Sequence, residues 1–252
     1  MRPLAWSHSA LNDFMTCPKA YFHKRIAKDV QDVPGEAATW GDRVHKAFEA
    51  YLKGVSSAEV GIRLDPELEI YKGYLDAIAA RPGVMYVEQQ LAINKQMEPC
   101  GWFDKDVWMR GIIDVLHVDG DTGTVLDHKT GKPKNDPRQL KLFALLVFIH
   151  HPEVQVCNSE FQWLKFGTTD SAQYLRSQEA ELWQEMLPDL LRYRMAFKLE
   201  VFNPRPSGLC NGWCPVKQCQ HWKPKRSRTK KSPPNREVRR GKGLNEGDEC
   251  FN

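Results

Sequence analysis

The sequence predicts an α/β fold in which helices flank a central mixed β-sheet. Extended apolar runs separated by turns occupy the middle of the 252-residue chain, between Val84 and Phe166. Segments with apolar residues at helical spacing come before these runs and return from Pro137 onward. A cysteine-rich stretch, Asn203–Trp222, and a charged tail complete the chain. This length fits one large domain, or one domain with an appendage.

Three helical segments are predicted before the sheet. The first spans Ser7 to about Lys28, and Pro18 is expected to begin its second piece because proline is well placed at a first helical position. The second covers about Thr39–Lys53. The third covers about Pro66–Ala80, where a following Arg-Pro-Gly acts as a stop.

The sheet is predicted to centre on a β-hairpin. Ile112–Val118 and Thr124–Lys129 are strand-like, and the turn between them contains Asp, Gly and Thr. Val84–Ile93 is predicted to be a strand that leads toward this hairpin, with Glu88 in its middle. A glutamate in mid-strand most often faces solvent, so Glu88 alone is weak evidence of a site.

Later elements alternate again between helix and strand. A helix is predicted over Pro137–His150, a strand over Val154–Phe166, and a long helix over about Gln178–Leu199 that Pro188 is expected to kink.

Composition favours a soluble protein of the cytoplasm. Hydrophobic residues make up 41% of the chain, as in ordinary globular proteins. No run of about 18 apolar residues is present, and the first residues lack the apolar core of a signal peptide. We therefore expect no membrane partner. Seven irregularly spaced cysteines favour free thiols or metal ligands over a disulfide framework.

The positive charge of the chain is concentrated in its tail. Residues 223–252 hold ten Lys and Arg against four Asp and Glu, which gives +6, so the remaining chain is near −2 for a total of +4. The tail has almost no apolar residues and is predicted to be disordered. It could be a solubilising appendage or an arm that holds nucleic-acid phosphates.

The central hairpin carries a candidate catalytic group. Asp127 and Lys129 are two residues apart, so in a strand they share one face, and Asp114 on the partner strand can reach the same space. Carboxylates beside a lysine suit a hard divalent cation such as Mg²⁺. The alternative is a solvated hairpin whose charges form surface pairs.

Three cysteines, Cys210, Cys214 and Cys219, lie close together among prolines and glycines near the end of the predicted domain. Clustered thiols in a reducing compartment indicate metal ligands. Cys17 is the obvious fourth ligand, although His221 could complete a zinc site instead. Taken alone, Cys17 would be a small buried apolar residue.

The motifs and their order together resemble the PD-(D/E)XK nuclease superfamily. They are SHSALNDFMTCPKAYF, GDRVHKAF, an isolated strand glutamate, GIIDV, VLDHKTGK and QLKLFALL. The resemblance is to the RecB-like branch with an iron–sulfur clasp, found in AddB-type helicase–nucleases and many phage exonucleases. It implies a restriction-endonuclease-like core, a nuclease domain over residues 1–222 that includes the cysteine cluster at 203–222, and a separate tail at 223–252.

The resemblance also implies roles for individual residues. His45, Asp114 and Asp127 would bind Mg²⁺ or Mn²⁺ together with the backbone carbonyl of His128. Lys129 would be the catalytic lysine. Gln139 is implied as a further catalytic residue, near the DNA backbone and the active site. Phe143 stands where many members have tyrosine, and Glu88 matches a less regular acidic position.

A 4Fe–4S cluster on Cys17, Cys210, Cys214 and Cys219 is implied in the same way. The chain has C-x3-C-x4-C where relatives often show C-x2-C-x5-C, so the middle cysteine is displaced by one residue. Zinc or a site without metal is the alternative. The cluster would join the two ends of the nuclease domain and would serve structure.

The implied activity is metal-dependent DNA hydrolysis by an exonuclease of recombination, repair or replication, in a bacterial or phage-infected cytoplasm. No phosphate-binding loop of the G-x-x-x-x-G-K-[ST] type occurs, so a helicase or recombinase partner would be a separate chain. One alternative is a structure-selective endonuclease, and the other is a non-catalytic DNA-binding accessory protein. The intact Asp114, Asp127 and Lys129 argue against the second.

Overall fold

The structure is a computed structural model that describes residues 1, 4–31, 33–56, 63–134 and 136–225. The part of the predicted disordered tail from 226 to 252 lies outside the described residues. None of the described helices combines the length and apolar character needed to cross a membrane.

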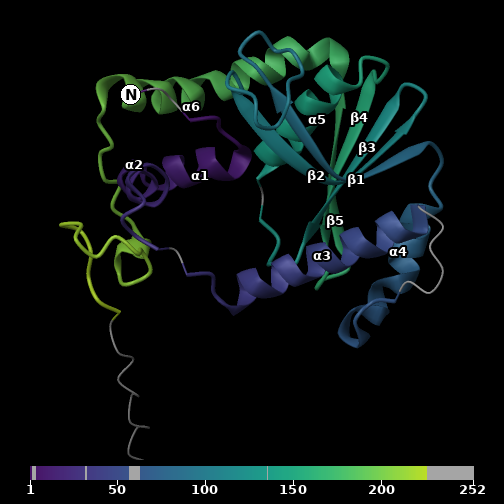
Figure 1. Ribbon diagram of the computed structural model, residues 1–252, viewed down its shortest axis with the longest axis horizontal. Helices are drawn as coiled ribbons and strands as arrows, with labels where there is room; N and C mark the ends of the chain where they lie inside the picture. The colour runs from purple at the N-terminus through teal and green to yellow at the C-terminus, as the bar shows by residue number, and fades with distance from the viewer. Residues whose placement is uncertain (2–3, 32, 57–62, 135, 226–252) are drawn as a thin grey trace, which may run out of the picture.

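A five-stranded sheet forms the centre of the molecule, which confirms the predicted α/β class (Figure 1). Its strands lie side by side in chain order: β1 (Val84–Ile93), β2 (Met109–Asp119), β3 (Thr122–Lys129), β4 (Val156–Trp163) and β5 (Thr168–Leu175). Neighbours are antiparallel except β3 and β4, which are parallel. A parallel pair needs a crossover, and α5 (Pro137–His150) provides it. The sheet is therefore mixed.

Strand β5 is a correction to the sequence prediction, which ended the sheet at Phe166. Residues Thr168–Leu175 pair antiparallel with β4 after a turn at Gly167, whose φ is 58°. The strand lies at the edge of the sheet, and most of its residues are exposed. An edge strand with few buried side chains has no clear alternation of apolar and polar residues. The residues of β5 therefore did not predict a strand.

The helices follow the predicted segments with shifted bounds. Pro18 separates α1 (His8–Thr16) from α2 (Pro18–Tyr21), which continues as a π-helix over Phe22–Ala27. The next helix, α3 (Glu36–Ser56), is longer than predicted, and the segment expected as one helix is a 3-10 turn, Pro66–Tyr71, followed by α4 (Lys72–Ala79). Pro188 lies inside α6 (Glu179–Leu199).

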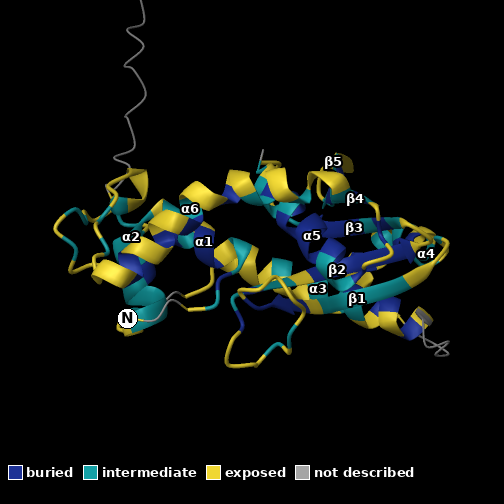
Figure 2. Cartoon of the chain, turned by 90° about the horizontal axis from the view of Figure 1, so that it is seen from above, coloured by how far each residue is buried: buried dark blue, intermediate teal, exposed yellow. Residues whose placement is uncertain are grey.

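The two faces of the sheet pack against different helices. One core contains the apolar residues of α1, α5 and α6, and the other contains those of α3 and α4. Helix α5 is almost wholly buried, as the dark blue colour in Figure 2 shows. Polar side chains on the strands can therefore be enclosed between the sheet and α3 or α5.

Strands β1 and β2 change faces at their midpoints. On β2, Ile113 packs in the α5 core and Val115 in the α3 core, although residues two apart in a regular strand share a face. On β1, Val87 packs beside the α3 core and Leu91 in the α5 core. The switch occurs around Asp114 and Glu88, so the backbone is irregular where these acidic residues lie.

Candidate active site

Three acidic residues lie at one level of three neighbouring strands. Glu88 on β1 is opposite Asp114 on β2, because the pairs on either side, Val87 with Val115 and Gln89 with Ile113, are in register. Val115 and Leu126 are the last paired residues of β2 and β3. Asp114 and Asp127 are the next residue on each strand, directly beyond this pair.

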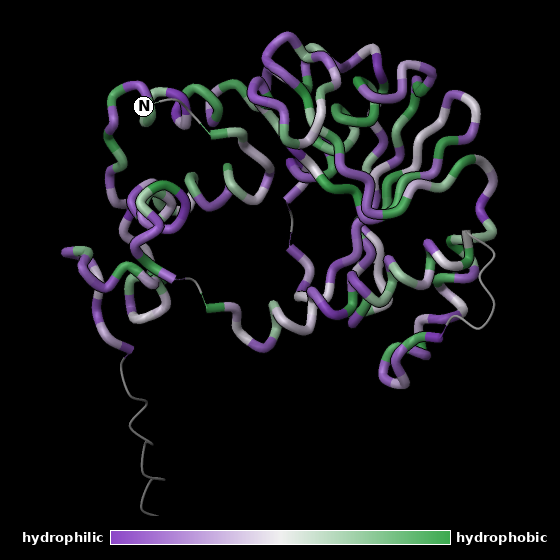
Figure 3. Tube along the Cα trace, viewed as in Figure 1, coloured by the Kyte–Doolittle hydropathy of each residue, from purple (hydrophilic) through white to green (hydrophobic). Residues whose placement is uncertain are grey.

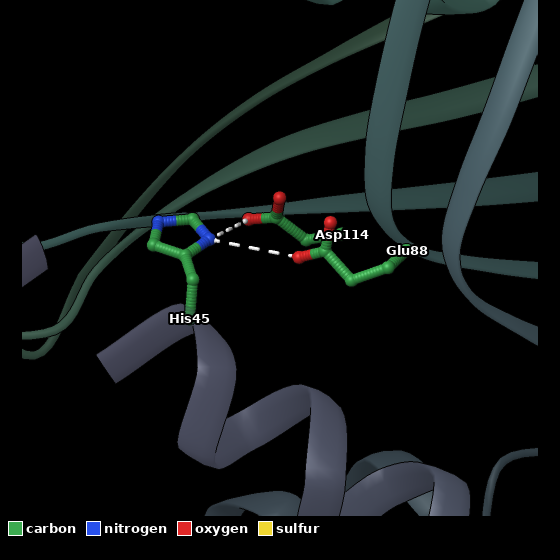
Figure 4. Close-up of side chains that lie close together, drawn as sticks. All are labelled: His45, Glu88 and Asp114. Carbon is green, nitrogen blue, oxygen red and sulfur yellow. Dashed lines mark ion pairs between the residues drawn. The ribbon is translucent and has the colours of Figure 1, made fainter. Parts of the chain in front are cut away.

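Glu88 adopts a left-handed backbone conformation with φ 50°. Such a conformation costs a non-glycine residue of the order of 1–3 kcal/mol and often marks a functional site. Here it interrupts the ladder and accompanies the change of face. The side chain of Glu88 is 21% exposed and points toward Asp114 (Figure 4).

Helix α3 brings His45 to these carboxylates (Figure 4). Its Nδ1 atom lies 3.2 Å from Oδ2 of Asp114 and 3.9 Å from Oε1 of Glu88. One ligand atom from each of the three residues lies within 4.8 Å of the others. Two carboxylates and an imidazole are a donor set that suits a divalent cation such as Mn²⁺ or Mg²⁺.

His128 positions Asp114 from the neighbouring strand. Its backbone N–H donates a 2.7 Å hydrogen bond to Oδ2 of Asp114. Its imidazole is buried and packs edge-on against Phe48 and Tyr74, and burial lowers its pKa to about 4, so the ring is neutral. Sequence reasoning assigned only the backbone carbonyl of His128 and missed the packing of its ring.

Asp127, Lys129 and Gln139 form a second group beside the first. The amide of Gln139 donates to Oδ1 of Asp127 at 3.0 Å and accepts from Nζ of Lys129 at 3.0 Å. The ammonium of Lys129 also contacts Oδ2 of Asp127 and lies 5.1 Å from the ring centre of Phe161. Gln139 is in the first turn of α5, so the crossover helix holds the lysine in place.

Negative charge in this buried region is only partly compensated. Burial, and then repulsion by Asp114, raise the pKa of Asp127 to about 7. Burial also opposes ionisation of Asp114, but its hydrogen bond with His45 holds its pKa below the ordinary value. Burial disfavours protonated His45, yet Asp114 and Glu88 raise its pKa to about 10. A buried pair of carboxylates attracts a cation.

The sequence-predicted residues thus fall into three places. His45, Asp114 and Glu88 form the metal-type cluster, and Asp127, Lys129 and Gln139 form the adjoining group. Phe143 lies elsewhere, buried in the α5 core beside Gly111. A Cβ at Gly111 would be 3.7 Å from the Phe143 ring, so Phe143 packs the helix against β2.

The four predicted cluster ligands, Cys17, Cys210, Cys214 and Cys219, line one small cavity. Cys17 comes from the break between α1 and α2, and its Sγ accepts the backbone N–H of Arg205 at 3.4 Å. His221 lines the same cavity, and the described cysteines are free of disulfides. Four thiols around one cavity could hold a metal ion or a metal cluster.

Asp127→Asn is expected to stabilise the metal-free protein. The raised pKa means that folding disfavours the ionised carboxylate, so this cost is complete only above the folded pKa of about 7 and shrinks as the pH falls below it. With EDTA at about pH 8, the variant should unfold about 3 °C or more above the parent, and the gain should be smaller near pH 5. Exposed Asp119→Asn is the control in thermal scans. Equal unfolding temperatures at both pH values would contradict this account.

Comparison with known proteins gives one family. Residues 5–219 match the sequence pattern of the PD-(D/E)XK nuclease superfamily, a span that contains both groups of the site and the four cysteines. No curated protein matches the chain in sequence.

Three solved structures are similar to this chain at TM-scores below 0.5. The protein SSO0001 is 14% identical with a TM-score of 0.43, covering 88% of both chains. A candidate exonuclease from Eubacterium rectale is 11% identical with a TM-score of 0.47, covering 86% of both chains. LHK-Exo in complex with dAMP is 13% identical with a TM-score of 0.42, covering 78% of this chain and 89% of the other.

Proposed function

The chain belongs to the PD-(D/E)XK nuclease superfamily and is therefore a phosphodiester hydrolase; from this premise we propose that it is a metal-dependent exonuclease acting on DNA. The observation that carries the proposal is the proximity of two groups, since Asp114 of the first raises the pKa of Asp127 in the second. The His45, Glu88 and Asp114 cluster adjoins a lysine that Asp127 and Gln139 hold in place.

The proposed metal ligands are His45, Asp114, Asp127 and the carbonyl of His128, with Glu88 added because its carboxylate lies in the same cluster. A bound Mg²⁺ or Mn²⁺ would polarise the scissile phosphate and lower the pKa of a water ligand. With the metal bound, His45 would give up the proton that its raised pKa favours in the metal-free site, and its imidazole would hold the site in one geometry together with Glu88 and Asp114. His128 would keep Asp114 oriented through its backbone N–H.

Lys129 would orient the attacking water and stabilise the charge that develops on the phosphate. It is suited to this because its ammonium is half-buried and fixed by two partners, so little reorganisation is needed when the substrate binds. Gln139 holds both Lys129 and Asp127, and on this view it is a positioning residue.

A single cleavage assay tests this function. Purified protein is mixed with linear DNA labelled at either end, single- or double-stranded, with and without Mg²⁺ or Mn²⁺, and with covalently closed circular DNA. An exonuclease degrades the linear substrates and leaves the circle intact. Cutting of the circle would support the structure-selective endonuclease instead, and no cleavage of any substrate with either metal would support the non-catalytic DNA-binding protein.

Glu88→Gln is expected to weaken metal binding more than it slows the chemistry. The variant keeps the side-chain shape but removes one anionic oxygen ligand, so the Mg²⁺ concentration for half-maximal cleavage should rise about tenfold or more. Exposed Glu69→Gln is the matched control. A Mg²⁺ dependence equal to that of the parent would remove Glu88 from the proposed ligands and leave His45 and Asp114 in place.

The proposed clasp is a 4Fe–4S cluster on Cys17, Cys210, Cys214 and Cys219. Two observations support this proposal: the four cysteines line one cavity, and the backbone N–H of Arg205 donates a hydrogen bond to Sγ of Cys17. Zinc remains the alternative because His221 lies at the same cavity. The cluster would tie the N-terminal helices to the last described segment.

The basic tail is proposed to attract DNA over long range. If it engages about three to five phosphates, truncation after Trp222 should flatten the slope of log K against log salt by roughly three to four units. The measurement is DNA affinity at several salt concentrations, with Asp114→Ala in both proteins to prevent cutting. Equal slopes would indicate a solvated appendage, whereas loss of turnover on saturating short substrates would place the tail at the active site.

A further inference from the structure

A groove outside the active site combines an apolar floor with a positive rim. It lies between α6 and the segments that flank β1 and β2, has a volume of about 580 Å³, and shares no lining residue with the catalytic groups. Trp6, Trp108 and Tyr193 are among its apolar lining residues. Figures 1 and 3 show α6 along the edge of the molecule, where its trace carries hydrophobic as well as hydrophilic residues.

Two leucines of α6 are exposed at this groove in the described part of the structure. Leu187 is 48% exposed and Leu191 is 54% exposed, and both line the groove together with the exposed Leu4. Single exposed leucines are ordinary, but several around one groove indicate an interaction surface.

Among the described residues that line the groove, every charged side chain is cationic. Lys95 lies just after β1, and Arg194 and Lys198 lie on α6. Within the described part of the chain, none of the three forms an ion pair or a side-chain hydrogen bond. Elsewhere on α6, in contrast, Arg192 pairs with Asp189 at 3.7 Å. The groove therefore presents uncompensated positive charge beside apolar surface.

The apolar and basic residues are ordered along one face of α6. Leu187, Leu191, Arg194 and Lys198 follow each other at spacings of four, three and four residues, which keeps them on one side of a helix. From the rise of an α-helix, Leu191 and Lys198 are about 10 Å apart along the axis. A ligand that fits must place an apolar anchor and carboxylates at a similar separation.

We propose that this groove binds an acidic amphipathic segment of a partner protein, with its apolar side chains on Leu187 and Leu191 and its carboxylates at Lys95, Arg194 and Lys198. Charge complementarity selects an anionic partner, and the exposed aliphatic side chains select a peptide over single-stranded DNA. Bases of single strands stack on accessible aromatic rings. Trp6 and Tyr193 are only 1% and 2% exposed. The half-buried Trp108 contacts the rings of Trp6 and Trp183 at centroid distances of 5.3 and 5.7 Å, so these aromatic residues offer no open stacking platform.

The test uses a fluorescent helical peptide with two leucines one turn apart and two glutamates about one and two turns further on. Its comparison peptides replace the glutamates by lysine or the leucines by serine, and a labelled single-stranded oligonucleotide is measured in EDTA. The acidic amphipathic peptide should bind the full-length protein at least about tenfold more tightly than either comparison peptide. Leu191→Glu and Lys198→Glu should each weaken binding about fivefold or more, without changing DNA cleavage.

Leu199→Glu and Arg192→Glu are the matched controls, because both residues are exposed on α6 but do not line the groove. Thermal scans confirm that all variants remain folded. Equal binding of acidic and basic peptides, no binding of any peptide, or equal effects of control and groove variants would overturn the proposal. Oligonucleotide binding lost in Lys198→Glu would assign the groove to DNA, and a dimer abolished by Leu191→Glu would assign it to a second copy of the chain.

Discussion

Lys129→Ala is expected to lower the rate of DNA cleavage by about a thousandfold while DNA affinity changes little. The lysine is the one ammonium group that contacts both Asp127 and Gln139 in the described site, so no other cation there can take its place at the phosphate. Removal of a single group that stabilises developing charge costs enzymes about a hundred- to thousandfold in rate. The measurement is single-turnover cleavage of a labelled duplex, with affinity determined separately in Ca²⁺ or EDTA.

Lys132→Ala is the control, because this exposed lysine follows the strand and is expected to contact phosphate without taking part in the chemistry. Its effect should appear in substrate affinity, with the single-turnover rate at saturation near that of the parent. Asp114→Asn should match the loss seen with Lys129→Ala. A contaminant-free Lys129→Ala protein that cleaved DNA at the parental rate would disprove the assignment of the site.

The hairpin and the placement of its charged side chains were accessible from sequence because they depend on local rules. Strand alternation puts Asp127 and Lys129 on one face, and the turn residues place β2 beside β3, so Asp114 is brought near them. The same rules failed for β5, whose polar residues lie at a sheet edge and carry no core pattern. The spacing of apolar residues indicates which side chains are buried. It therefore misses elements that bury few side chains.

Glu88 shows a different limit. Its strand was predicted, but its role depends on a φ of 50° that takes the side chain to His45, and nothing in the surrounding residues encodes that conformation. The contact of Gln139 with Lys129 likewise depends on how the crossover helix docks on the sheet. A role for Gln139 at the site was expected only through the resemblance to a family. Tertiary packing decides both positions.

The cysteine cavity is a third case, because the cysteines that line it are distant in sequence. The cluster at Cys210, Cys214 and Cys219 was visible from spacing, and the choice of Cys17 as the fourth ligand remained open against His221. The structure brings Cys17 to the same cavity, but His221 lies there too. Chemical analysis is therefore the direct way to decide which group these thiols hold.

Cys17→Ser is expected to cost the protein its proposed cluster and much of its stability. Anaerobically purified parent should be brown and contain about four iron atoms per chain, as a cluster with four cysteine ligands requires. Because metal binding contributes directly to folding, the variant should contain little iron and unfold at least several degrees lower. Segment 203–222 should also become more sensitive to protease, since Cys17 would no longer tie it to the N-terminal helices.

Cys100→Ser is the control for this experiment, because Cys100 is a half-buried free thiol that does not line the cavity. It should keep the iron content and unfolding temperature of the parent. Cleavage of short substrates by Cys17→Ser at low temperature should remain close to that of the parent, since no proposed catalytic group lies at the cavity. Colourless parent with stoichiometric zinc would assign the site to zinc, where His221→Ala should then release the metal if the histidine is a ligand. A Cys17→Ser protein that retained all of its iron would exclude Cys17 from the ligands.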